Sequence, residues 1–67
     1  MKAIYHTEFT RKGFGQWNIS IEFYDGQVLN IYSTDSELFD EWNSLEGEEK
    51  NQLIAERLDY KIEELLN

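Results

Sequence analysis

The amino-acid sequence predicts an α+β fold in which a three-stranded antiparallel β-meander is followed by two α-helices packed on one face of the sheet. Three observations lead to this β-β-β-α-α order. Apolar residues alternate with polar ones in the first half, an Asp-Gly pair separates two of these runs, and apolar residues recur at helical spacing in the second half. We therefore expect one two-layer domain over residues 1–67, with the meander in 1–34 and the helices in 35–67.

The clearest strand signal is the stretch WNISIEF, in which every second residue from Trp17 to Phe23 is apolar. A period of two predicts a strand with one buried face. A weaker alternation precedes it. There, Ala3, Tyr5, Thr7 and Phe9 form the row expected to face the core, and Ile4 and His6 are expected on the outer face. Glycines in the stretch RKGFG, residues 11–15, predict the turn between these two strands.

The Asp-Gly pair after this strand predicts a β-hairpin with a third strand over residues 28–32. A two-residue loop would place Ile21 opposite Asn30, in the core. A three-residue loop over Tyr24–Gly26, with its glycine in a left-handed conformation, would place Ile21 opposite Leu29 instead. We predict the three-residue loop, because it keeps the amide of Asn30 out of the core.

Two helices are expected in the second half. Thr34 and Glu37 have the spacing of a capping box and predict a helix that begins after Thr34. Gly47 is expected to interrupt the helical pattern, and a longer helix should start at Glu48. The apolar faces of the short and the long helix would consist of Leu38, Phe39, Trp42 and Leu45, and of Ile54, Leu58, Ile62 and Leu65, respectively.

Composition excludes several classes of protein. The chain has no cysteine and one histidine, so disulfides and a Cys/His zinc site are excluded, and we expect no metal and no cofactor. A domain of 67 residues has little core, so aromatic packing or self-association has to stabilise it. A homodimer is therefore an alternative to a monomer. No apolar stretch is long enough for a membrane helix, and we expect a cytoplasmic protein.

The net charge of −8 is unevenly distributed. Residues 1–34 are neutral in sum, whereas residues 35–67 contain all of the excess of acids over bases. We therefore consider two candidate binding surfaces. The first, on the outer face of the sheet and the turn between strands one and two, comprises Arg11, Lys12, Phe14, Tyr24 and Tyr32. The second, an acidic face of the long helix, comprises Glu49, Glu56, Asp59 and Glu63.

The stretch KGFGQWNI, residues 12–19, matches the first four positions of the RNP1 signature of RNA-recognition domains. RNP1 stacks bases on aromatic residues at its third and fifth positions. Here the third is Phe14, but the fifth is Gln16, and the negative net charge opposes binding to phosphates. We interpret the stretch as a glycine turn, with single-stranded nucleic-acid binding as an alternative function.

Catalysis has little support in the sequence. The single histidine, His6, lies on a predicted strand, and so small a chain does not easily form an enclosed pocket. We therefore expect that the protein is not an enzyme. We expect a small acidic interaction or accessory protein that binds another protein through one of the two candidate surfaces. A further alternative is an acidic mimic of nucleic acid, which would use the carboxylates of the long helix. Binding to nucleic acid or to membranes is not expected.

Overall fold

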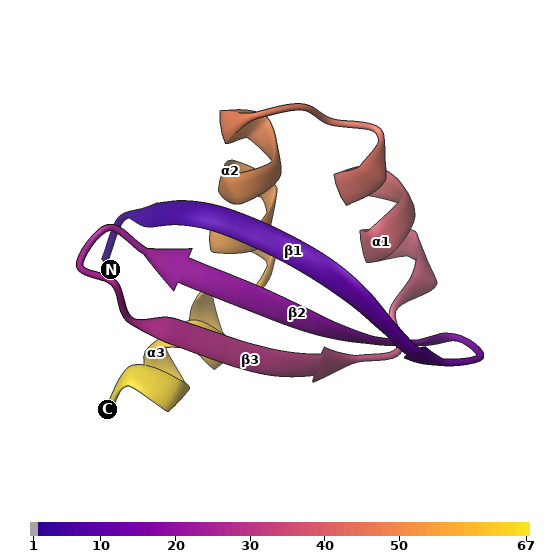
Figure 1. The fold of residues 1–67 in the computed structure, drawn as a ribbon, viewed down its shortest axis with the longest axis horizontal. Coiled ribbons are helices and arrows are strands. Elements are labelled where there is room, and N and C mark those ends of the chain that lie inside the picture. Colours follow the sequence, from indigo (N-terminus) through magenta and orange to yellow (C-terminus); the bar gives the residue numbers. More distant parts are fainter. Residues whose placement is uncertain (1) are drawn as a thin grey trace.

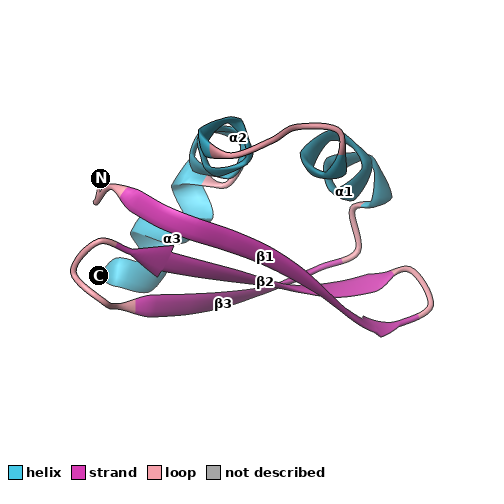
Figure 2. Ribbon diagram, turned by 45° about the horizontal axis from the view of Figure 1, so that its top comes forward, coloured by secondary structure: helices cyan, strands magenta, loops and turns pink. Residues whose placement is uncertain are grey.

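The computed structural model describes residues 2–67, and its sheet and helices follow in the predicted order (Figure 1). The elements are β1 (Ile4–Gly13), β2 (Gln16–Phe23), β3 (Val28–Ser33), α1 (Ser36–Asn43), α2 (Glu48–Arg57) and α3 (Asp59–Leu66). The three strands form one antiparallel sheet in the order β1-β2-β3. The helices cover one face of this sheet, and the other face is open (Figure 2). The predicted α+β meander is therefore confirmed, with three helical pieces in place of two.

The predicted hairpin register is confirmed. Ile21 lies opposite Leu29 in the pairing of β2 with β3, as expected for a three-residue loop. Gly26 has a φ of +90°, a left-handed conformation that glycine adopts without steric cost. The N–H of Phe23 donates to the carbonyl of Gln27 at 2.9 Å and closes the loop. Asn30 remains exposed, and its exposure was the reason for predicting this register.

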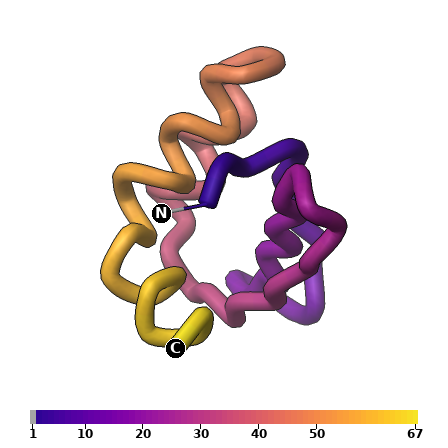
Figure 3. Tube along the Cα trace, turned by 90° about the vertical axis from the view of Figure 1, so that its left-hand side faces the viewer, coloured from indigo at the N-terminus to yellow at the C-terminus, as the bar shows by residue number. Residues whose placement is uncertain are grey.

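The core lies between the sheet and the helices. Alternate residues of β2 are buried along its whole length, as period-two patterning predicts. The buried apolar cluster comprises Ile4, Ile19, Ile21, Phe23, Ile31, Leu38, Trp42, Ile54 and Ile62. Figure 3 shows the helical half of the chain running alongside the strands, with the C-terminal turn close to β3. Every element thus contributes to one core.

The prediction for the start of β1 is wrong. We expected Ile4 on the outer face and Tyr5 in the core, but Ile4 is buried and Tyr5 is 55% exposed. The pairing shows why: Ile4 lies opposite Phe23 and His6 lies opposite Glu22, so Tyr5 is an extra residue in a β-bulge. The bulge switches the faces of the residues before it and brings Ile4 into the core.

The cap of the first helix is one residue later than predicted. Asp35 is the N-cap of α1, and its side chain accepts a hydrogen bond from the N–H of Leu38 at 3.0 Å. Thr34 is exposed and has no capping role. An aspartate at this position also brings negative charge to the positive end of the helix dipole. The predicted capping box is therefore not formed, and the carboxylate of Asp35 caps the helix instead.

The predicted long helix is bent into two. Leu58 separates α2 from α3 with φ −113° and ψ 18°, although Ile62 N–H still donates to its carbonyl at 2.9 Å. With this bend Ile54 and Ile62 are both fully buried. Leu65, expected on the buried stripe, is instead 43% exposed. Leu45, expected on the face of the first helix, lies beyond the end of α1.

Candidate binding surfaces

The tip of the β1–β2 hairpin carries the most exposed apolar side chain among the described residues. Phe14 sits at the turn between β1 and β2, and its side chain is fully exposed. Gly15, with a φ of +68°, allows the tight reversal. A register irregularity between Arg11 and Gly13 makes Lys12 the extra residue at the end of β1.

An aromatic cluster supports this hairpin from the helix side. Trp17 stacks on Phe39 of α1, with ring centroids 5.0 Å apart and an interplanar angle of 15°. Phe9 packs against Trp42, with centroids 4.7 Å apart. The guanidinium of Arg11 lies 5.2 Å from the centroid of the Trp17 ring, a cation–π contact. The base of the hairpin is therefore packed against α1, whereas Phe14 at its tip is fully exposed.

The positive charges of the hairpin are not neutralised within the described residues. Lys2 pairs with Asp25, Arg57 with Glu41, and Lys61 approaches Glu64. In contrast, neither Arg11 nor Lys12 forms an ion pair in residues 2–67. The hairpin is thus a small positive region on a protein whose net charge is −8.

The structure separates the five residues of the first predicted surface. Arg11 and Lys12 flank Phe14 near the hairpin tip, but Arg11 lies on the helix side of the sheet, over Trp17. Tyr32 lies opposite Asn18 on the outer face and is 60% exposed. Tyr24 lies at the other end of β2, in the β2–β3 turn. Arg11, Lys12 and Phe14 thus share the hairpin end of the sheet, and Tyr24 lies at its opposite end.

Tyr24 has a different partner, Tyr5 of the β1 bulge. Their ring centroids are 5.3 Å apart in an edge-to-face arrangement. Beside them, the ammonium of Lys2 lies 2.7 Å from the carboxylate of Asp25. This ammonium and the backbone N–H of Gln27 both hydrogen-bond to Asp25 and hold the pKa of its carboxyl below the ordinary value. These contacts fix the β2–β3 turn and make it a structural feature.

The outer face of the sheet is more polar than we expected. Its rows across the three strands are His6, Glu22 and Val28; Glu8, Ser20 and Asn30; and Thr10, Asn18 and Tyr32. The amide of Asn18 donates to Asn30 at 2.9 Å, and His6 pairs with Glu8 at 2.9 Å. Without Ile4, which is buried, Val28 and Tyr32 are the two large apolar side chains of this face. They do not form a continuous apolar patch.

The acidic residues of the second predicted surface are divided by the bend at Leu58. Glu49 and Glu56 lie on α2, whereas Asp59 and Glu63 lie on α3. The first three are exposed, and Glu63 is partly buried and has an interaction partner. The four carboxylates therefore do not line one straight helix face, which the prediction of a phosphate-like array assumed.

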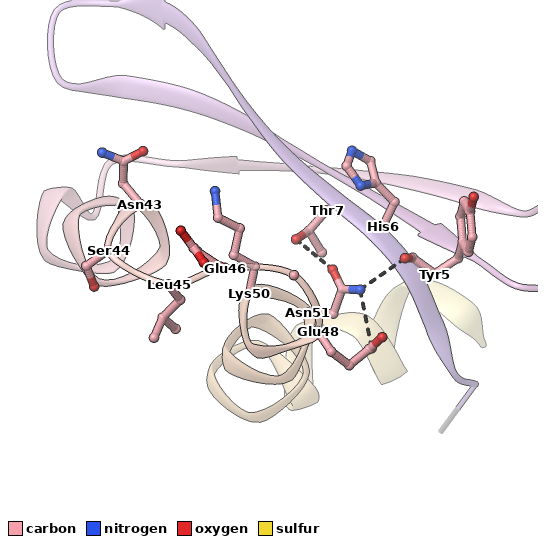
Figure 4. Close-up of a pocket in the computed structure, with 11 residues that line it drawn as sticks. Tyr5, His6, Thr7, Asn43, Ser44, Leu45, Glu46, Glu48, Lys50 and Asn51 are labelled. Atoms are coloured by element: carbon pink, nitrogen blue, oxygen red, sulfur yellow. Dashed lines mark hydrogen bonds between the residues drawn. The ribbon is translucent and has the colours of Figure 1, made fainter.

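Sequence reasoning missed a buried polar network between β1 and the helices. Trp42 donates its indole N–H to the hydroxyl of Thr7 at 3.0 Å, and Thr7 donates to the amide oxygen of Asn51 at 3.0 Å. Asn51 in turn donates to the backbone carbonyl of Tyr5 at 3.0 Å, as the dashed line in Figure 4 marks. A threonine in the inward row of β1 was the available signal, because a buried hydroxyl needs a partner.

Tyr5, Thr7 and Asn51 of this network line an open groove of about 590 Å³ between β1 and the α1–α2 loop (Figure 4). Lys50 lies over Trp42, with its ammonium 3.7 Å from the ring centroid. The groove contains no cysteine, and its histidine, His6, hydrogen-bonds the exposed Glu8. The amide of Asn51 and the hydroxyl of Thr7 are satisfied within the network, and the hydroxyl of Ser44 donates to the backbone carbonyl of Glu41 at 2.7 Å. Among the described residues that line the groove, no hydroxyl or ammonium group hydrogen-bonds a histidine or a carboxylate, the contact that would activate a nucleophile.

Comparisons with known proteins give no family or neighbour: no family model, no curated protein and no solved structure matches the chain significantly. Within residues 2–67, no His, Cys, Asp and Glu side chains gather in a group of three or more that could hold a metal ion. No helix in the described part of the chain combines the length and apolar character needed to cross a bilayer.

Proposed function

We propose that the protein is a small binding module, not an enzyme, and that it docks onto another protein through the hairpin tip Arg11–Gly15. The observation that carries this proposal is the full exposure of Phe14 beside two cations without carboxylate partners. Burying a phenylalanine side chain is worth about 1.5–3 kcal/mol, and aromatic and arginine side chains dominate protein interfaces. We place this activity in the cytoplasm, in keeping with a chain that contains no cysteine.

The chemistry of the tip defines the surface that it fits. A partner would offer an apolar pocket for the ring of Phe14, with carboxylates at its rim for Arg11 and Lys12. Nucleic acid fits less well, because the net charge of −8 repels phosphates and the tip has one exposed aromatic ring for stacking. The aromatic packing below the tip supports the proposal, since it positions the base of the hairpin before docking.

Site-specific photocrosslinking tests this proposal. A photoreactive phenylalanine analogue replaces Phe14 in the cells that produce the protein, and in a control chain it replaces Tyr60, an 84% exposed aromatic residue on α3. We expect a discrete protein adduct from position 14 and not from position 60. Adding Arg11→Glu and Lys12→Glu should abolish the adduct, because charge reversal repels an acidic rim.

The proposal is overturned if positions 14 and 60 give the same adducts, or if charge reversal at the tip leaves the adduct unchanged. It is equally overturned if position 14 crosslinks to nucleic acid. Far-UV circular dichroism of each variant shows whether the fold is retained, which is expected because Lys12 and Phe14 are exposed and Arg11 contacts the core through one cation–π contact with Trp17.

A further inference from the structure

The two edges of the sheet differ in how their unpaired backbone groups are protected. Along β1, charged side chains and two register irregularities interrupt the edge, and the side-chain amide of Asn51 donates a hydrogen bond to the backbone carbonyl of Tyr5. Natural sheets use such features to prevent a further strand from adding. β3 has none of them: residues 26–34 contain no charge and no proline, and β3 pairs with β2 without a bulge.

The hydrogen bond that closes the β2–β3 hairpin determines which backbone groups face the open edge. The N–H of Phe23 donates to the carbonyl of Gln27. Because the direction of hydrogen bonding alternates along an antiparallel strand, Leu29 and Ile31 point their N–H and C=O groups toward β2. The groups that point outward, away from β2, belong to Val28, Asn30 and Tyr32.

We propose that β3 pairs with β3 of a second copy of this chain, antiparallel, about a two-fold axis at Asn30. In this register Asn30 faces the second copy's Asn30, and Val28 faces the second copy's Tyr32. Every outward-pointing residue then meets another outward-pointing residue, and each such pair exchanges two hydrogen bonds. The result is a continuous six-stranded sheet in which both helical layers lie on the same side.

The side chains of β3 favour its own copy as the occupant of this edge. Leu29 would face the second copy's Ile31 on the helix side, which keeps the apolar faces in line, whereas a shift by one residue would oppose inner and outer faces. On the outer face, Val28 and Tyr32 are 48% and 60% exposed and would form aromatic–β-branched cross-strand pairs. β3 contains no charged residue, so pairing it with β3 of a second copy would bring no like charges together within the new strand pair.

The acidic helices make a distinctive prediction for this dimer. Each chain has a net charge of −8, and its excess acidic residues lie in 35–67, outside β3. Dimerisation would bring the acidic helices of the two copies close together, and their like charges would repel. Salt screens this repulsion, so the dimer should tighten as ionic strength rises from about 0.01 M to about 0.15 M. An interface held by ion pairs would weaken over the same range.

Single cysteines test the register, because the natural chain contains none. In Asn30→Cys the two cysteines would face each other as a hydrogen-bonded pair, with Cα atoms about 5.5 Å apart, within the range of a disulfide. Tyr32→Cys is the matched control on the same strand and face. Its two copies would lie about 13 Å apart along the strand, too far to be bridged. We expect mild oxidation to give a covalent dimer of the first variant at least tenfold faster than of the second.

A second variant tests the pairing without a disulfide. The N–H of residue 30 points away from β2, so Asn30→Pro leaves the pairing with β2 intact and removes the central donor of the open edge. Sedimentation should show a dimer of the natural chain and a monomer of the folded proline variant. A natural chain that stays monomeric up to about 1 mM, or equal crosslinking of the two cysteine variants, overturns the proposal. Phe14→Ala should leave the dimer unchanged, which separates this edge from the hairpin tip.

Discussion

Thr7 and Asn51 lie 44 positions apart in the chain, and their side chains share a buried hydrogen bond of 3.0 Å. The contact joins the first strand to α2. Trp42 donates to the same hydroxyl, so one threonine connects β1 with both α1 and α2. No buried side-chain polar atom of the described residues lacks a partner, and this network accounts for the polar side chains that the core contains.

Thr7→Val tests the network. Valine has nearly the same shape as threonine, but it leaves the Trp42 indole N–H and the Asn51 amide oxygen without their partner. We expect the free energy of unfolding to fall by about 1–3 kcal/mol, measured by urea denaturation. Thr10→Val, at an exposed threonine of the same strand, should change it by less than about 0.5 kcal/mol. Equal effects of the two substitutions would contradict an energetic role for the network.

The cap of α1 gives a test between two neighbouring residues. Asp35→Ala removes the acceptor of the Leu38 N–H and should lower the free energy of unfolding by about 0.5–2 kcal/mol. Thr34→Ala, one position earlier, should have little effect, because Thr34 does not cap the helix. Thermal denaturation of the two variants side by side measures the difference. A larger loss from Thr34→Ala would support the capping box that the sequence suggested.

Core burial predicts a large effect at Ile21 and a small one at Leu65. Ile21 is fully buried, so Ile21→Ala should cost about 2–5 kcal/mol, enough to unfold much of so small a domain. Leu65 is 43% exposed, and Leu65→Ala should cost less than about 1 kcal/mol. Circular dichroism during urea titration measures both. Similar losses would mean that α3 packs as the straight, uninterrupted helix that the sequence predicts.

The pair formed by Lys2 and Asp25 should make stability depend on pH in the acid range. Its hydrogen bonds lower the pKa of Asp25 in the folded state below the ordinary value of 3.8. The carboxyl of Asp25 therefore binds a proton more readily in the unfolded chain than in the folded one. The stabilisation by the Lys2–Asp25 pair is complete above pH 3.8 and is lost as the pH falls through the folded-state pKa. Asp25→Asn should lessen the acid-dependent fall of the urea midpoint. Asp40→Asn removes a charge from α1, keeps the pair, and should retain that fall.

The sequence was a reliable guide where a local pattern had one structural solution. The Asp-Gly pair and the strict alternation before it predicted the β2–β3 register, because the alternative two-residue loop would bury Asn30. The order of strands and helices followed from periodicity and from the turn residues between the periodic segments. The candidate hairpin residues could be found in the same way, since a glycine turn with an aromatic residue at its tip is local information.

The parts that could not be predicted depend on contacts between distant segments. The bulge at Tyr5 accompanies the burial of Ile4 and the hydrogen bond from Asn51 to the Tyr5 carbonyl, and neither contact can be inferred from residues 2–10 alone. No proline or glycine lies near Leu58, so the local sequence does not predict the bend there. It accompanies the full burial of both Ile54 and Ile62 against the sheet. Tertiary packing overrides the helical pattern there.

The contact between Asn51 and the carbonyl of Tyr5 has a consequence for how many chains can join. A sheet that can accept a neighbour at both edges grows without end, and the product is a fibre. A chain with one usable edge joins one other chain, and growth then stops. Together with the charged side chains and the two register irregularities of β1, the amide of Asn51 protects that edge, so the proposed pairing through β3 would end at a closed pair.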